Sequence, residues 1–236
     1  MKVEIWSDIM CPFCYIGKRR FENALQEFSH KEDIEVIWKS FQLNPNLKTQ
    51  PTKNINNYLA EIKGWTIDHA KQMNDHVTNM AKEVGLDYDF DKAVVANSFD
   101  GHRLIQLAKA NGKGDAMEER LFRAYFTEGK NIADHSTLIQ LGTEIGLDPI
   151  TIKKVLESNE YVDKVEQDIY EARQIGVSGV PYFVFNNRYA VSGAQASETF
   201  LGALNKAWGE LEKERPALRG ISSDNAAVCS TDGECN

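Results

Sequence analysis

The sequence predicts an α/β fold in which a small mixed sheet is built from both ends of the chain and is interrupted by a large all-helical insertion. Three observations lead to this prediction. A strand-like run followed at once by a helical pattern opens the chain, residues 52–174 are helical in pattern, and strands in hairpin order with a closing helix follow over residues 177–211. We expect residues 1–50 and 175–214 to form one domain, residues 51–174 the inserted domain, and residues 215–236 a flexible C-terminal tail.

The composition indicates a globular protein. The 236 residues are 42% hydrophobic and 26% charged, and a chain of this length can bury most of its apolar surface. A net charge of −8 argues against nucleic acid or an anionic membrane as a partner, and no uncharged apolar run approaches the length of a membrane span. Because Met1 leads directly into a strand, we expect a cytoplasmic location, where stable structural disulfides are rare.

The first two elements are a strand over Val3–Trp6 and a helix that begins in the run Cys11-Pro12-Phe13-Cys14. We expect Cys11 to cap this helix and Pro12 to occupy its first position, where the fixed φ of proline suits the helix. Apolar or small side chains then recur at the spacing of a helix that buries one side: Cys14, Gly17, Phe21, Ala24, Leu25 and Phe28.

This placement of the two cysteines predicts a redox-active pair. The Cys11 sulfur is expected beside unpaired N–H groups and the positive end of the helix dipole, which favour the attacking thiolate form. Cys14 lies one turn later and faces inward, so it can release a mixed disulfide formed on Cys11. The C-x-x-C spacing also suits two zinc ligands, but the following residues supply no others. We therefore predict no metal and, in the absence of a nucleotide or flavin motif, no cofactor.

The second strand is expected over residues 34–43, where both faces are largely apolar, as in an inner strand of a covered sheet. The insertion that follows is expected to hold helices near residues 67–84, 97–110, 115–126, 136–145, 149–157 and 159–175. Within it, Asp115 and Glu118 have the spacing of a capping box at a helix start.

Pro181 stands immediately before a strand that should pair in the sheet centre, where a trans proline is out of place. A cis Val180–Pro181 bond resolves this conflict, and an ordinary trans proline in a loop is the alternative. We expect the loop to face Cys11 and to offer the backbone N–H and C=O groups of Val180 to an extended substrate strand.

Together these motifs resemble the DsbA-like branch of the thioredoxin superfamily, and more closely its FrnE-type members, which are predicted dithiol-disulfide isomerases. The resemblance covers about residues 2–211 and is carried by these runs: Cys11–Arg19, Phe41–Pro45, Asn97–Leu104, Leu121–Phe126, Gly179–Pro181 and Tyr189–Gln195. It implies a thioredoxin-like fold with a large all-helical domain inserted between its two halves. It also implies thiol–disulfide exchange in which Cys11, Cys14 and Pro181 carry the matched roles. The expected partners are protein thiols and disulfides or small thiols of the glutathione type, and the expected state is a monomer or a homodimer.

Three further residues, besides Pro12 and Phe13, are candidates for accessory roles at the site. Asp8 either relays the proton of Cys14 or caps the loop before the helix. Lys39 either places its ammonium beneath the dithiol or remains at the strand edge. His102 either lines the cleft or is a hydrogen-bonded structural histidine.

Cys229 and Cys235 in the tail form a candidate second redox pair. They are six positions apart in a polar segment, so a disulfide between them is sterically allowed. The resemblance adds that FrnE-type proteins can carry such a C-terminal pair. The alternative is an unstructured tail with two incidental thiols.

Three functions compete on this reading. The leading one is an enzyme that exchanges disulfides through a mixed disulfide on Cys11, which Cys14 resolves. The second is a glutathione-dependent transferase or isomerase of the kappa-class type, which shares the insertion layout but favours a serine at the attacking position. The third is a non-enzymatic cysteine module that binds a metal or senses redox state.

Overall fold

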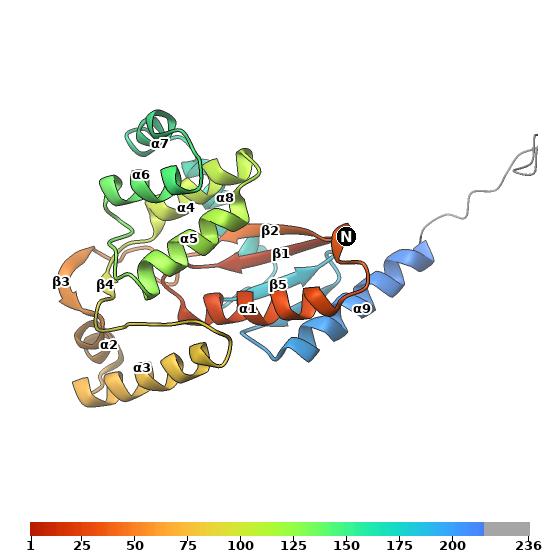
Figure 1. The fold of residues 1–236 in the computed structure, drawn as a ribbon, viewed down its shortest axis with the longest axis horizontal. Helices are drawn as coiled ribbons and strands as arrows, with labels where there is room; N and C mark the ends of the chain where they lie inside the picture. The colour runs from red at the N-terminus through yellow and green to blue at the C-terminus, as the bar shows by residue number, and fades with distance from the viewer. Residues whose placement is uncertain (215–236) are drawn as a thin grey trace, which may run out of the picture.

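A four-stranded mixed sheet lies at the centre of the computed structural model, which describes residues 1–214 (Figure 1). Its strand order is β2-β1-β5-β6. β1 (Lys2–Ser7) pairs in parallel with β2 (Glu35–Ser40) and antiparallel with β5 (Tyr182–Phe185), and β5 pairs antiparallel with β6 (Tyr189–Ser192). The sheet therefore joins the first forty residues of the chain to residues beyond 181, as the sequence predicts.

Two helices cover one face of this sheet, α1 (Pro12–Glu27) and α9 (Ser197–Glu214). Successive side chains of a strand point to opposite faces, so alternate residues of β1 and β5 meet these helices. The resulting core includes Val3, Ile5, Phe21, Ala24, Phe183, Phe185, Phe200 and Leu204. The opposite face is partly covered by α8 (Val162–Gln174), where the indole N–H of Trp6 donates to the Asp168 backbone oxygen at 2.9 Å.

The insertion is mainly helical, but it is not all-helical. Its helices before α8 are α2 (Ile55–Lys63), α3 (Ile67–Lys82), α4 (Phe99–Ala110), α5 (Gly114–Phe126), α6 (His135–Glu144) and α7 (Pro149–Leu156). Two short strands, β3 (Gln50–Asn54) and β4 (Val94–Val95), pair antiparallel beside them. The sequence reading missed this ladder because β4 has only two residues and β3 is polar and largely exposed.

The start of α5 also differs from the expectation. α5 begins at Gly114, and its first turn has no side-chain cap, so Asp115 and Glu118 do not form a capping box. Asp115 instead accepts a hydrogen bond from the Trp38 indole at 2.9 Å, and Glu118 is buried. Both carboxylates therefore belong to the packing of the insertion against the sheet domain.

The insertion has its own apolar core, which extends to the beginning of α1. Its members include Ile9, Cys11, Cys14, Ile16, Leu104, Phe122 and Phe126. The two cysteines thus belong to the core of the insertion, although they lie on a helix of the sheet domain. Within residues 1–214, no helix is long and apolar enough to cross a bilayer. Cys229 and Cys235 lie outside the described residues, so the second redox pair stays a prediction.

Candidate active site

The dithiol occupies the first turn of α1, at the end of the sheet where β1 finishes. Cys11 is the N-cap of α1, with φ −88° and ψ 111°, and Pro12 is the first helical residue, as predicted. The Cys11 amide donates to the Asp8 carbonyl at 2.9 Å, and the Cys14 amide donates to the Cys11 carbonyl at 3.0 Å. Both thiols are free, and they are only 4% and 1% exposed.

The loop that precedes β5 faces Cys11. The Val180–Pro181 peptide bond is cis, and the Cys11 thiol lies 3.4 Å from the carbonyl oxygen of Val180. α1 approaches this loop closely through Gly17, because a Cβ atom there would lie 3.0 Å from Cγ of Pro181. The Cys11 sulfur therefore lies between the backbone of residue 180 and the first turn of α1.

Cys14 lies on the inner side of the pair. Burial raises the pKa of its thiol well above the ordinary value, and the hydrogen bond and charge of Cys11 raise it further. The Asp8 backbone and the Ser7 hydroxyl act in the opposite direction. Cys14 is therefore a protonated thiol at neutral pH, and it must give up this proton to become a thiolate.

A buried carboxyl group of α5 lies behind Ser7. The Ser7 hydroxyl donates to Oε1 of Glu118 at 2.6 Å, and both side chains are almost fully buried. Burial raises the pKa of Glu118 to about 7; the Ser7 hydrogen bond and the charges of His102 and Lys18 lower it. The negative charge of nearby Asp115 raises it. An acid with a pKa near neutrality that is linked by a hydroxyl to a buried thiol is suited to accept and return a proton.

The sequence reading missed that Glu118 is a buried acid beside Ser7 because it assigned the residue to a helix cap. One signal was available in the pattern. Glu118 follows Met117 and precedes Leu121, Phe122 and Tyr125 at helical spacing, so it falls within the apolar face of α5. A carboxylate on the buried face of a helix is rare unless it is paired or functional.

Asp8 caps the loop that leads into α1. Its carboxylate accepts from the amide of Leu43 at 2.8 Å and from the amide of Met10 at 3.3 Å. Nε2 of His102 lies 3.5 Å from the same carboxylate, and this histidine is 1% exposed. The structure therefore places His102 beneath Asp8 as a buried side chain, not on the wall of a cleft.

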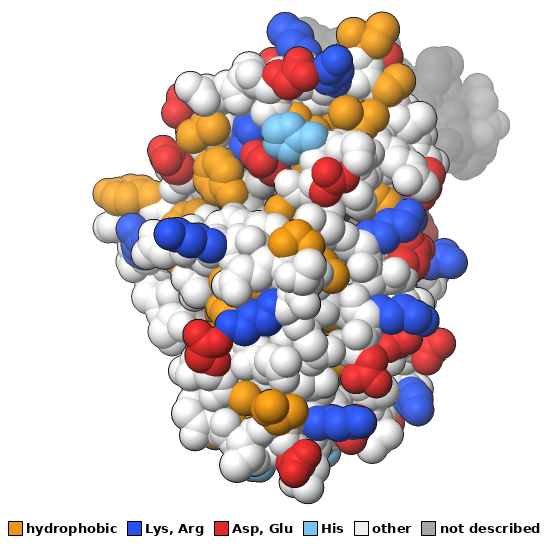
Figure 2. Space-filling model, turned by 90° about the vertical axis from the view of Figure 1, so that its left-hand side faces the viewer, with side chains coloured by type: hydrophobic (Ala, Val, Ile, Leu, Met, Phe, Trp, Pro, Cys, Tyr) orange, Lys and Arg blue, Asp and Glu red, His pale blue; other side chains and the backbone are white. Residues whose placement is uncertain are grey.

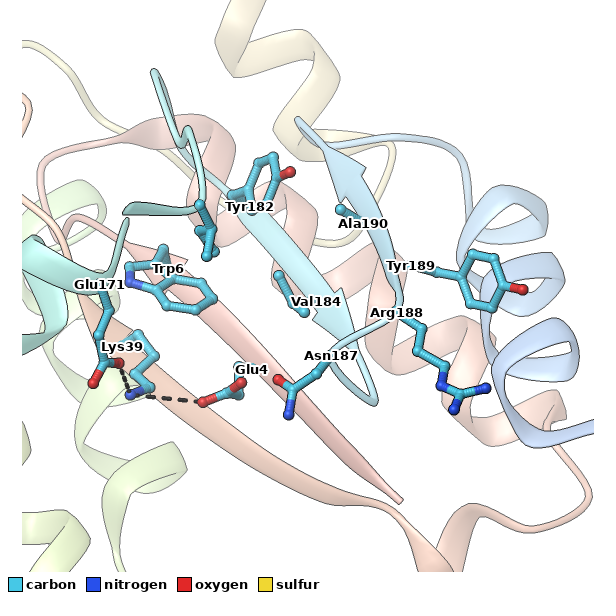
Figure 3. A pocket seen from close by; sticks show the side chains of 11 residues that line it. Glu4, Trp6, Lys39, Glu171, Tyr182, Val184, Asn187, Arg188, Tyr189 and Ala190 are labelled. Carbon is cyan, nitrogen blue, oxygen red and sulfur yellow. Dashed lines mark hydrogen bonds and ion pairs between the residues drawn. The ribbon is translucent and has the colours of Figure 1, made fainter. Parts of the chain in front are cut away.

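Lys39 does not reach the dithiol. Its ammonium lies 3.1 Å from Asp168, 2.6 Å from Glu171 and 3.6 Å from Glu4. Figure 3 shows Lys39 with Glu4 and Glu171 beside Trp6, on the sheet face opposite α1. Of the two alternatives for Lys39, the position beneath the dithiol is therefore wrong, because alternation along β2 directs the side chain to the face that α8 covers.

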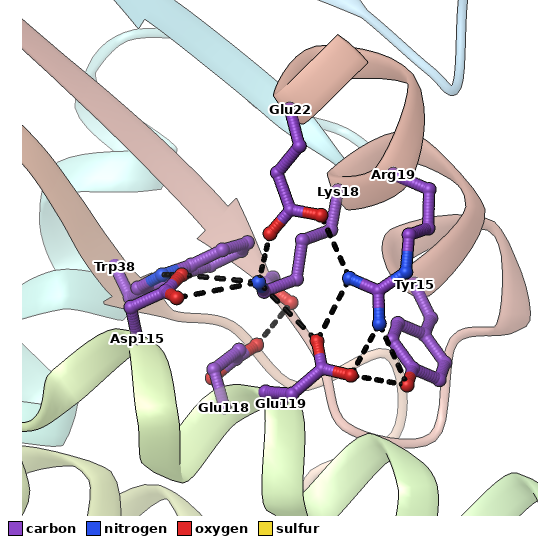
Figure 4. Close-up of polar contacts among 9 residues, drawn as sticks. Tyr15, Lys18, Arg19, Glu22, Trp38, Asp115, Glu118 and Glu119 are labelled. Atoms are coloured by element: carbon purple, nitrogen blue, oxygen red, sulfur yellow. Dashed lines mark hydrogen bonds and ion pairs between the residues drawn. The ribbon is translucent and has the colours of Figure 1, made fainter. Parts of the chain in front are cut away.

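A cluster of charged side chains fixes α5 against α1 (Figure 4). The Lys18 ammonium is buried and contacts three carboxylates: Glu22, Asp115 at 3.2 Å and Glu119 at 3.3 Å. Arg19 pairs with Glu22 and Glu119 in the same cluster. Because Glu118 is adjacent to Glu119 on α5, these ion pairs also hold the part of α5 that places Glu118 against Ser7.

Pro12 and Phe13 lie at the outer side of the site. The Pro12 carbonyl accepts a hydrogen bond from the Tyr88 hydroxyl at 2.8 Å, and the ring of Phe13 is exposed. Within residues 1–214, no group of three or more His, Cys, Asp or Glu side chains is arranged to hold a metal ion.

Comparison with known proteins gives a consistent family. A family profile described as "DSBA-like thioredoxin domain" matches residues 2–205. The structure is similar to that of a probable DsbA oxidoreductase from Streptomyces coelicolor, with a TM-score of 0.85 and 38% identity over 100% of this chain and 98% of that one. The cytosolic disulfide reductase DsbM of Pseudomonas aeruginosa has a TM-score of 0.60 at 19% identity, over 91% of this chain and 98% of DsbM, which shows the fold alone.

The sequence is also 29% identical to the uncharacterized protein YwbO of Bacillus subtilis over 210 residues, which cover 86% of this chain and 95% of that protein. The fold is thus thioredoxin-like with a helical insertion, and the chain belongs to the family of DSBA-like thioredoxin domains.

Proposed function

We propose that the protein is a thiol–disulfide oxidoreductase in which Cys11 forms a mixed disulfide with the substrate and Cys14 resolves it. The observation that carries this proposal is the position of the Cys11 sulfur at the start of α1, 3.4 Å from the Val180 carbonyl and next to the more deeply buried Cys14. A substrate bonded to Cys11 would lie against the backbone of residue 180, which can pair with an extended chain.

The exchange has two steps. In the first, the Cys11 thiolate attacks one sulfur of a substrate disulfide, forms a mixed disulfide and releases the other sulfur as a thiolate. In the second, Cys14 loses its proton and attacks the Cys11 sulfur, so a Cys11–Cys14 disulfide forms and the second substrate thiolate leaves. The substrate gains two electrons and the dithiol loses two, and the reverse sequence oxidises a substrate dithiol.

Glu118 acts as the proton acceptor for Cys14 in this proposal. The Ser7 hydroxyl donates to Glu118 at 2.6 Å and interacts with the Cys14 sulfur, so a proton can pass from Cys14 to Ser7 while the Ser7 proton passes to Glu118. A carboxyl group with a pKa of about 7 can accept the proton in the second step and return it in the reverse reaction. The insertion thereby contributes to the chemistry of a dithiol carried by the sheet domain.

Two serine variants test the assignment of the cysteines. The chain has four cysteines, so Cys229→Ser together with Cys235→Ser leaves only Cys11 and Cys14. In this background, Cys11→Ser is expected to reduce exchange with a peptide disulfide to the uncatalysed rate. Cys14→Ser is expected to stop at the mixed disulfide, which intact mass spectrometry detects as the mass of one peptide added to the protein. Exchange that continues in Cys11→Ser would contradict the proposal.

The direction of the reaction follows from the reduction potential of the dithiol relative to that of its surroundings, where 30 mV corresponds to about 1.4 kcal/mol for a two-electron couple. Equilibration with buffers of reduced and oxidised glutathione measures this potential. A comparison of the full chain with the Cys229→Ser/Cys235→Ser variant then shows whether the tail cysteines change it.

A further inference from the structure

His102 is a buried histidine whose ring has no hydrogen-bond partner. It lies on α4, it is 1% exposed, and neither ring nitrogen makes a hydrogen bond within residues 1–214. A buried polar group without a partner lowers stability, and folded proteins contain few of them. An apolar side chain would fill the same space without this cost, so the imidazole indicates a role beyond packing.

Two buried carboxyl groups interact with this ring. Nε2 of His102 lies 3.5 Å from Oδ1 of Asp8, in the loop between β1 and α1. Glu118 belongs to α5, which packs beside α4, and the charge of His102 acts on it. Both acids are 1% exposed. His102 is therefore within electrostatic range of the carboxylate that caps the active-site loop and of the one that accepts from Ser7.

His102 is the basic side chain nearest to the Asp8 carboxylate. Asp8 accepts hydrogen bonds from two backbone amides, and within residues 1–214 no lysine or arginine nitrogen lies within 4.0 Å of it. Asp8 also lines an apolar cavity of about 540 Å³ that opens beside Cys11, between α1 and the helices α2 and α3. Among the described residues in the wall of this cavity, Lys63 is the only lysine or arginine, and it is exposed.

Glu118 has few other sources of positive charge. The ammonium of Lys18 acts on it, but that ammonium directly contacts three other carboxylates. The charge of Asp115 acts in the opposite direction. His102 is thus the basic group near Glu118 that no second ion pair beyond Asp8 occupies, among the residues that the structure describes.

The remaining titratable groups around α4 do not take the place of His102. Burial raises the pKa of the Tyr125 hydroxyl on α5, so this group stays neutral. The charged groups on α4, α6 and α8 have partners of their own: Asp100 with Arg103 and His135, and Asp168 with Lys39 and Lys109.

Burial makes the interactions of His102 stronger than those of surface charges. Lysine, arginine and acidic side chains lie across the surface in Figure 2, where water weakens their interactions. Asp8, His102 and Glu118 are instead enclosed in the protein interior, where the effective dielectric constant is lower. A positive charge on His102 therefore favours the ionised form of Glu118.

We propose that His102 is a positioning residue whose positive charge, held by Asp8, keeps Glu118 ionised and ready to accept the proton of Cys14 at neutral pH. This inference rests on the proposed function and adds a residue that acts through Glu118. In the resolving step the proton of Cys14 passes to Ser7 while the Ser7 proton passes to Glu118. His102 keeps its proton throughout and does not touch the substrate.

The pH dependence of the resolving step tests this role. In the Cys229→Ser/Cys235→Ser protein, an excess of peptide disulfide loads Cys11, and acid quenching with intact mass spectrometry gives the rate at which the mixed disulfide disappears. His102→Gln removes the charge but keeps a polar side chain. It should move the inflection from near pH 7 to a pH about one unit higher, because a nearby opposite charge changes a pKa by about 1–3. The rate at pH 6 should then fall about tenfold, and the rate at pH 9 should stay the same.

Two controls identify Glu118 as the group through which His102 acts. His135 also lies beside a carboxylate, 3.0 Å from Asp100, but it is exposed at the start of α6, so His135→Gln should keep the inflection. In a Glu118→Gln background, His102→Gln should change the rate by less than about twofold at any pH, because the carboxylate on which it acts is absent.

NMR of the histidine rings gives a second measurement that leaves residue 102 intact. In protein labelled with ¹³C in its histidines, the His102 ring signals should titrate at a different pH in Glu118→Gln than in the wild type, because the charge of Glu118 is lost. Glu157→Gln, at an exposed position, should leave this titration unchanged. Identical titration of His102 in Glu118→Gln and the wild type would overturn the inference.

The kinetic outcomes separate this inference from the proposed function. An unchanged inflection in His102→Gln overturns the inference, and so does an equal loss of rate at every pH, which a purely structural role would produce. A loss that persists in the Glu118→Gln background also overturns it. In each of these cases exchange through Cys11 and Cys14 still stands. A protein that forms no mixed disulfide on Cys11 overturns the proposed function itself.

Discussion

Replacement of Glu118 by glutamine should remove a pH dependence from the stability of the protein. Burial raises the pKa of this carboxyl group from 4.5 to about 7. An acid whose pKa is higher in the folded state binds more protons folded than unfolded between the two values, so the free energy of unfolding falls as pH rises through this window. A shift of roughly 2.5 units corresponds to about 3 kcal/mol, at 1.36 kcal/mol per unit.

Urea unfolding of the reduced protein at pH 4.5 and pH 8, followed by tryptophan fluorescence, measures this difference. Between pH 4.5 and pH 8, the free energy of unfolding should fall by about 3 kcal/mol less for Glu118→Gln than for the wild type, because the glutamine side chain does not ionise. The amide oxygen of the glutamine can still accept the hydrogen bond from Ser7. Glu157→Gln, at an exposed position, is the control and should leave the pH dependence unchanged. A Glu118→Gln protein with the same pH dependence as the wild type would refute the assignment. In exchange assays, the resolving step of the wild type should accelerate with an inflection near pH 7 that the variant lacks.

Two further substitutions test how α1 packs against its neighbours. Gly17→Ala places a Cβ 3.0 Å from Cγ of Pro181, so it should lower the exchange rate several-fold without raising the free energy of unfolding. Gly202→Ala on α9 is the control: its new Cβ meets no atom within 4 Å, so the free energy of unfolding should rise by about 0.5–1 kcal/mol. Equal stability gains would contradict the close approach. Lys18→Met leaves three carboxylates without their ammonium partner; because these side chains are 31–62% exposed, the unfolding free energy should fall by about 2 kcal/mol, below the 3–5 kcal/mol of a fully buried pair. Lys153→Met removes an exposed pair and should change the free energy of unfolding by less than about 0.5 kcal/mol. If Lys153→Met lowered it as much as Lys18→Met does, burial of the ammonium would not explain the loss.

The parts of the site that local rules determine could be predicted from the sequence. The N-cap at Cys11 with Pro12 in the first turn follows from residue preferences at helix starts, which involve only a few neighbouring residues. The cis bond before Pro181 was predictable because a trans proline is out of place at the entrance to a central strand. Hydrophobic periodicity predicted the strands of the central sheet and most of the helices, but it missed α2, β3 and β4. It also predicted an inner position for β2, which lies at an edge of the sheet.

The parts that depend on contacts across the insertion could not be predicted in this way. Ser7 and Glu118 are 111 positions apart, and no local pattern indicates that they share a hydrogen bond. The apolar cavity combines residues of α1, the loop after β2, α2 and α3, so it exists only once these elements pack. For Lys39, a lone cation on an apolar strand gave no information on which face of β2 would meet acidic partners, and these partners, Glu4, Asp168 and Glu171, come from β1 and from the distant helix α8.

The pairing of β1 with β5 has a consequence for the synthesis of the protein. Val3 pairs with Phe185 and Trp6 with Tyr182. During synthesis, one edge of β1 therefore has no partner strand until the ribosome has added about 180 further residues. At about 5–20 residues per second this interval lasts roughly 10–40 s. During that time β2 can cover one edge of β1 and the helices of the insertion can form, but the other edge of β1 stays open. Nascent chains that end before residue 182 should therefore be prone to aggregate through this edge.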